Sequence, residues 1–134
     1  MNKRILSISI FVSILILGVL ACGASVTTAN IANAYLTADK SGSGQTTTFA
    51  QDQTFYCIVK LANAPDDTKV KAEWIAVNIE GADPNTVIDS AELVGGDQTL
   101  TFNLTNNGLW PTGTYKVNLY LNDTLERSLD FTVQ

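Results

Sequence analysis

The segment Thr54–Ala62, TFYCIVKLA, alternates between apolar and polar side chains over most of its length. A period of two residues is typical of a β-strand with one face buried in a core. The polar face carries Tyr56 and Lys60. The face that we expect to be buried consists of Phe55, Cys57, Val59 and Leu61.

Similar segments recur on both sides of this one, separated by turns rich in Gly, Asn, Asp and Pro. We expect strands at 31–39, 54–62, 69–79, 87–94, 99–105, 115–121 and 125–133, of which 87–94 alternates least clearly. About seven strands without a convincing helix predict an all-β fold, a single antiparallel β-sandwich. The short turn Asn122-Asp123 predicts that the last two strands form an antiparallel hairpin.

The segment 69–79 contains a conflict in its alternation. Its inward positions are Val70, Ala72, Trp74 and Ala76. The opposite face then carries three further apolar residues, Ile75, Val77 and Ile79. Either a β-bulge shifts the register within this strand, or its outer face is covered by another strand or by a partner.

Composition restricts the chemistry of the chain. Its 134 residues form at most one domain after removal of a targeting segment. It contains no histidine, which excludes Ser-His-Asp and Cys-His catalytic sets within one chain and imidazole-ligated zinc. The net charge of −5 comes without any basic patch, so we expect no nucleic-acid partner. No enzyme activity, catalytic residue, cofactor or metal is expected.

The N-terminus has the organisation of a targeting segment. Lys3 and Arg4 precede a charge-free run from Ile5 to Leu20, and small residues follow it. Val19-Leu20-Ala21-Cys22 resembles the lipobox of bacterial lipoproteins. This resemblance implies a signal peptide at 1–21, acyl chains such as palmitate on Cys22, and a lipid-anchored protein on the extracytoplasmic side of the cell membrane or outer membrane.

Two alternatives remain for this N-terminus: a secretory signal cut near Ala24, and an uncleaved membrane anchor. In the lipoprotein interpretation, 22–30 is the lipidated Cys and a flexible tether, and 31–134 is the domain. Without Lys3 and Arg4 the chain has 6 basic and 13 acidic residues, a net charge of −7. Because anionic head groups repel such a domain, the lipid on Cys22 would make the membrane contact.

The body of the chain resembles immunoglobulin-like and fibronectin-like domains at a few positions. Cys57 and Trp74 are spaced like the core Cys and Trp of immunoglobulin domains, and Gly113-Thr114-Tyr115-Lys116-Val117 resembles their tyrosine corner. Val117 stands where that family has its second core Cys. The resemblance therefore implies an Ig-like sandwich in which Cys57 is a single buried thiol that packs near Trp74 and Val117.

Three aromatic residues are candidates for contact with a ligand or partner. Trp110 lies in a connection, and Tyr56 and Tyr120 point away from the expected core faces. Such side chains stack on sugar rings or anchor protein partners. The alternative for Trp110 is that it caps one open end of the sandwich.

Carboxylates in the predicted turns could gather to bind calcium, but Asp is common in turns because it caps local backbone groups. We expect a membrane-anchored lipoprotein with a non-catalytic binding, adhesion or envelope-assembly role. Its partners would be the membrane through the lipid on Cys22, and other envelope proteins or glycans. The alternative is a glycan- or small-solute-binding module that uses surface aromatics.

Overall fold

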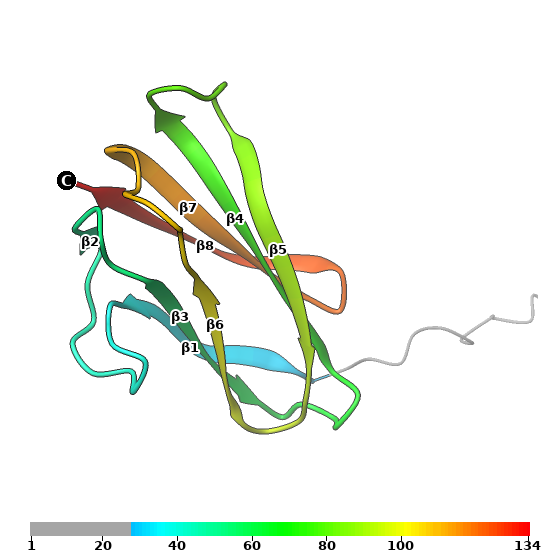
Figure 1. Ribbon diagram of the computed structural model, residues 1–134. Coiled ribbons are helices and arrows are strands. Elements are labelled where there is room, and N and C mark those ends of the chain that lie inside the picture. Colours follow the sequence, from blue (N-terminus) through cyan, green and yellow to red (C-terminus); the bar gives the residue numbers. More distant parts are fainter. Residues whose placement is uncertain (1–27) are drawn as a thin grey trace, which may run out of the picture.

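The structure, a computed structural model, describes residues 28–134, and this part of the chain is built entirely of strands and connections (Figure 1). The eight strands are β1 (Asn30–Thr37), β2 (Thr48–Phe49), β3 (Phe55–Ala62), β4 (Lys69–Ile79), β5 (Thr86–Val94), β6 (Thr99–Leu104), β7 (Gly113–Leu121) and β8 (Thr124–Val133). The expected all-β fold is confirmed. The lipobox Val19–Cys22 and the proposed signal peptide lie outside the described residues, among which no helix is long and apolar enough to cross a membrane.

The strands form two sheets that face each other as an open sandwich (Figure 1). One sheet has three strands in the order β1-β3-β6, and the other has five in the order β2-β8-β7-β4-β5. All neighbours pair antiparallel except β2 and β8, which run parallel. The two-residue strand β2 was not expected from the sequence, because it is too short to show a period.

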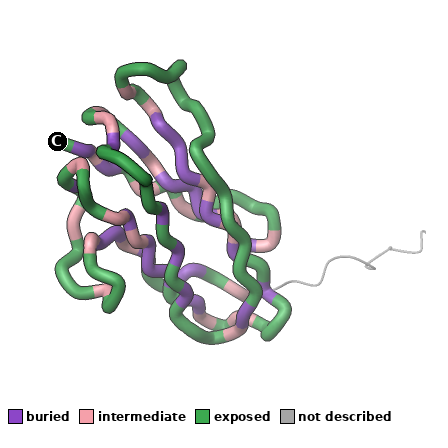
Figure 2. Tube along the Cα trace, in the orientation of Figure 1, coloured by how far each residue is buried: buried purple, intermediate pink, exposed green. Residues whose placement is uncertain are grey.

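The core lies between the two sheets, where apolar residues from alternate strand positions meet (Figure 2). In β3 the predicted inward face is confirmed, since its four members are at most 3% exposed. Ring contacts organise one end of this core around Phe55, whose ring centroid lies 4.6 to 6.3 Å from those of its neighbours. These neighbours are Phe49, Trp74, Trp110, Tyr115 and Phe131.

A bulge in β4 resolves the conflict in its alternation. Relative to β7, the register shifts between Ala76 and Asn78, so that Val77 is an extra residue. Ile79 is thereby turned inward and packs against the core. Ile75 precedes this shift and stays outside the core cluster, although it is only 6% exposed.

The β7–β8 hairpin confirms the predicted turn. Asn122 and Asp123 both have positive φ, 46° and 69°, as the two central residues of a type I′ turn require. At the other end of β7, Gly113 has φ +145°, and a Cβ there would collide with the carbonyl oxygen of Asn78. Only glycine fits this position without a shift of the β4 backbone.

β5 differs from the other strands because both of its faces are exposed. It pairs with β4 alone, and each of its nine residues is exposed (Figure 2). The five-stranded sheet therefore extends past the three-stranded sheet on this side and ends in a free edge.

Candidate functional site

Trp110 is part of the core rather than of the surface. It is only 6% exposed, and its ring stacks on Phe55 with 4.6 Å between centroids and 23° between planes. Its Nε1–H donates to the carbonyl oxygen of Gln53 at 2.9 Å. Its backbone N–H donates to the Gln51 carbonyl at 2.8 Å. This placement corresponds to the capping alternative, and it leaves no ring face free for a sugar or a partner.

Tyr120 and Tyr56 are half-buried and lie on opposite sides of the molecule. Tyr120 is on the outer face of the five-stranded sheet, where Lys71 Nζ lies 4.4 Å from its ring centroid. Its hydroxyl donates to Glu73 Oε1 at 3.5 Å. Tyr56 is on the outer face of the three-stranded sheet, paired with Thr37 and Asn103. The three aromatic candidates therefore do not form one site.

The residues that carried the immunoglobulin-like resemblance lie together in the core. Trp74 and Val117 are cross-strand partners in β4 and β7, and both are at most 2% exposed. The Tyr115 hydroxyl donates to the Pro111 carbonyl at 2.6 Å, four residues upstream. That bond is the defining contact of a tyrosine corner.

Cys57 is an unpaired thiol with no exposed surface. Burial raises the pKa of this thiol to about 12, because the interior disfavours the thiolate. A thiol that stays protonated at neutral pH is a poor nucleophile and a poor metal ligand. Within 28–134, no three Cys, Asp or Glu residues gather in a way that would hold a metal ion.

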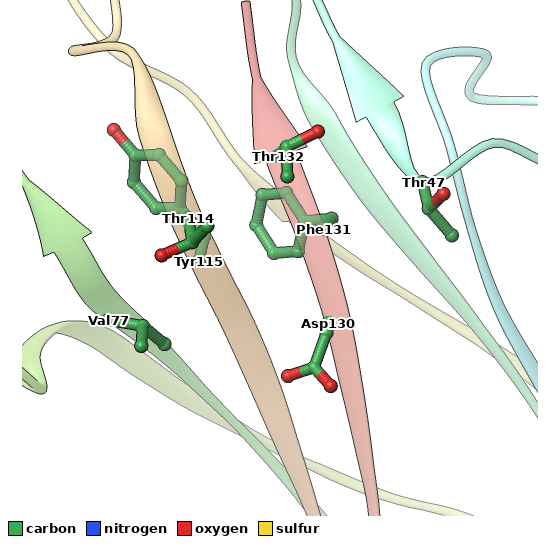
Figure 3. Close-up of a pocket in the computed structure, with 7 residues that line it drawn as sticks. All are labelled: Thr47, Val77, Thr114, Tyr115, Asp130, Phe131 and Thr132. Carbon is green, nitrogen blue, oxygen red and sulfur yellow. The ribbon is translucent and has the colours of Figure 1, made fainter.

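The outer face of the five-stranded sheet has a hollow of about 380 Å³ near the ends of β7 and β8 (Figure 3). Its polar groups are the Asp130 carboxylate and the hydroxyls of Thr47, Thr114 and Thr132. Tyr115 and Phe131 also line it, but their side chains are buried on the core side. The hollow thus offers hydrogen-bonding groups without an exposed aromatic surface or a cation.

The edge strand β5 is a surface feature that the sequence pattern did not indicate as functional. Four of the six exposed large apolar side chains in residues 28–134 belong to it: Val87, Ile88, Leu93 and Val94. The weak alternation of this segment was the available signal. A strand with apolar residues on both faces is either buried on both faces, as inside a sheet covered on both sides, or exposed on both faces, as β5 is.

Searches of the sequence against protein-family models and against curated proteins find no match. Solved structures do match the fold. An immunoglobulin-like protein from Pseudomonas aeruginosa matches with a TM-score of 0.54 and 16% identity, over 79% of this chain and 96% of that one. At this identity the likeness establishes an Ig-like fold and nothing about function.

Two enzymes contain a part with the same fold. The alkylpurine DNA glycosylase AlkC of Pseudomonas fluorescens, bound to DNA containing an abasic site analogue, matches with a TM-score of 0.51 and 16% identity. A β-glucosidase from Listeria innocua, in complex with glucose, matches with a TM-score of 0.51 and 14% identity. Each match covers 79% of this chain but only 30% of the glycosylase and 16% of the glucosidase.

Proposed function

We propose that this protein is a bacterial lipoprotein that displays a single non-catalytic Ig-like module on the extracytoplasmic side of a membrane, where it binds other envelope components. The observation that carries the proposal is the spacing of two features. The lipobox-like Val19–Cys22 is followed within a few residues by Asn30, the first residue of β1. An acyl anchor and a folded module would thus be joined by a short tether.

The chemistry of the described residues supports a binding role over a catalytic one. The only thiol among them is buried and protonated, and the chain has no histidine. A module of this kind acts through its surface and its edges.

The glycan-binding alternative is weakened by the position of its main aromatic residue. Trp110 is held in the core, and the Tyr120 ring already lies under the ammonium group of Lys71. Within residues 28–134, a flat aromatic surface open to a sugar ring would have to come from Tyr56 or Tyr35, the other two half-buried aromatic residues. We therefore favour binding of a protein partner over binding of a glycan.

Metabolic labelling with palmitate in a bacterial host tests the anchor. Wild type should carry the label and fractionate with membranes, whereas Cys22→Ser should lose the label and be released or remain unprocessed. Cys57→Ala is the matched control, because it removes the other cysteine and should keep the label. A processed Cys22→Ser protein that stays fully in the membrane fraction would contradict the proposal.

A further inference from the structure

We infer that the free edge of β5 is a docking site for an extended, basic segment of another protein, which adds to the five-stranded sheet as a further strand. This inference rests on the binding role proposed above but not on the lipid at Cys22. The two are tested by separate experiments, so the failure of one is distinguishable from the failure of the other.

The backbone of β5 presents unused hydrogen-bonding groups along this edge. The Gly95 N–H donates to the Thr68 carbonyl at 3.0 Å, which shows which residues of β5 face β4. Because antiparallel residues bond alternately to the two sides, Leu93 and Ala91 bond to β4, opposite Val70 and Ala72. The N–H and C=O groups of Ser90, Glu92 and Val94 consequently point outward, to where a further strand would lie.

One of these outward groups is already occupied from within the strand. Asp89 Oδ1 accepts a hydrogen bond from the Ser90 N–H at 2.8 Å. A carboxylate that bonds to an edge N–H discourages casual pairing, as charged residues on edge strands commonly do. The Glu92 and Val94 N–H groups remain available for pairing. If the incoming strand displaced the Asp89 carboxylate from the Ser90 N–H, a Lys or Arg of that strand would pair with the carboxylate instead.

The charge of the edge selects the occupant. β5 carries Asp89 and Glu92 and no basic residue, and the turn before it carries Glu80 and Asp83. A second copy of this chain would bring the same acidic strand and the same net negative charge, so like charges would face each other. A segment with Lys or Arg opposite Asp89 and Glu92 gains attraction instead.

The apolar side chains specify the rest of the partner segment. Exposed apolar residues lie at both ends of β5, on either side of the acidic pair: Val87 and Ile88 precede Asp89, and Leu93 and Val94 follow Glu92. A matching segment therefore has basic residues in its middle and apolar β-formers at both ends. Main-chain hydrogen bonds supply affinity in such strand addition, and the side chains supply selectivity.

A synthetic peptide serves as the probe: fluorescein-Thr-Val-Thr-Lys-Thr-Lys-Thr-Val-Thr-amide, whose sequence reads the same in both directions and so fits parallel or antiparallel addition. Anisotropy titrations would use the full chain in a zwitterionic detergent, which does not itself attract the peptide. We expect this peptide to bind and to protect the Glu92 and Val94 amides from hydrogen exchange. Raising the salt concentration should weaken this binding.

Two charge-matched controls separate strand addition from simple attraction. The same peptide with alternate amides N-methylated keeps its lysines but loses its donors, and should bind about tenfold more weakly or worse. A peptide with Glu in place of Lys should not bind. Equal binding of the N-methylated and parent peptides would overturn the inference, and so would the absence of binding by the parent peptide.

Variants of β5 complete the test. Val94→Pro removes an outward N–H without removing a bond to β4, and should weaken binding by about tenfold, whereas Val94→Ala keeps the N–H and should lose less. Glu92→Lys should reverse the preference between the Lys and Glu peptides. If light scattering instead shows that the chain dimerises and that Val94→Pro abolishes the dimer, the occupant is a second copy and the inference is wrong.

Discussion

Replacing Trp110 with Ala should lower the free energy of unfolding by about 3–5 kcal/mol. A tryptophan buries on the order of 150–250 Å² in a core, and Trp110 is 94% removed from solvent. At about 25 cal/mol per Å² this area is worth about 4–6 kcal/mol, of which the Ala side chain retains a part. The loss should be large because Phe55 would keep its place and leave a cavity beside its ring.

Trp110→Phe separates the ring from its hydrogen bond. The phenyl ring can still stack on Phe55, but the carbonyl of Gln53 loses its donor. We expect a loss of about 1–2 kcal/mol, the cost of one hydrogen bond together with a partly buried acceptor left without a partner. Comparing the two variants therefore separates the stability contributed by ring packing from that contributed by the hydrogen bond.

Urea unfolding of the full chain in a non-ionic detergent measures both effects, with Trp74 remaining as the fluorescent reporter. Tyr56→Ala is the control, because this aromatic lies half-buried on an outer face and should cost much less. The burial argument fails if Trp110→Ala unfolds within about 0.5 kcal/mol of wild type, the range of ordinary surface substitutions.

Three further outcomes are expected. Gly113→Ala should cost about 1–3 kcal/mol in urea unfolding, since its Cβ would collide with the Asn78 carbonyl at a φ of +145°; an unchanged midpoint would refute this. Tyr115→Phe should cost about 1 kcal/mol by removing the bond to the Pro111 carbonyl, and a neutral result would mean that this bond contributes nothing. Between pH 9 and 12 the Cys57 thiol should ionise only in the unfolded chain, because its folded pKa is raised to about 12. Stability should therefore fall as pH rises through that window, and the fall should be smaller in Cys57→Ala.

The sequence predicts those parts of the fold in which one face of a strand is buried. β3 and β6 alternate cleanly because each packs one side against the core. The tyrosine corner was predictable from Gly113 and Tyr115, because a glycine at positive φ and a tyrosine with an upstream acceptor form a local motif.

The rest depended on long-range contacts that leave little trace in the local pattern. β2 pairs only with β8, which lies far along the chain. The burial of Trp110 depends on Phe55 and Gln53, more than fifty residues away, so the sequence left two alternatives for it, a surface contact and a cap on one end of the sandwich. The free edge of β5 follows from strand order, which no local pattern encodes.

The direction of the chain through the sandwich has a mechanical consequence. β1 begins at one end of the molecule, and β8 finishes at the opposite end, next to β2 (Figure 1). Tension between an anchored N-terminus and Gln134 would run along these strands, so the Thr132–Thr47 and Gln134–Phe49 backbone bonds would be sheared together.

Force applied between Gly108, in the connection before β7, and Gln134, just after β8, would instead unzip the β7–β8 ladder bond by bond from the Gly113–Val133 pair. Single-molecule stretching should therefore require a higher force for the end-to-end geometry, and equal forces would contradict it. A module that is pulled end to end would therefore stay folded when force acts on a bound partner.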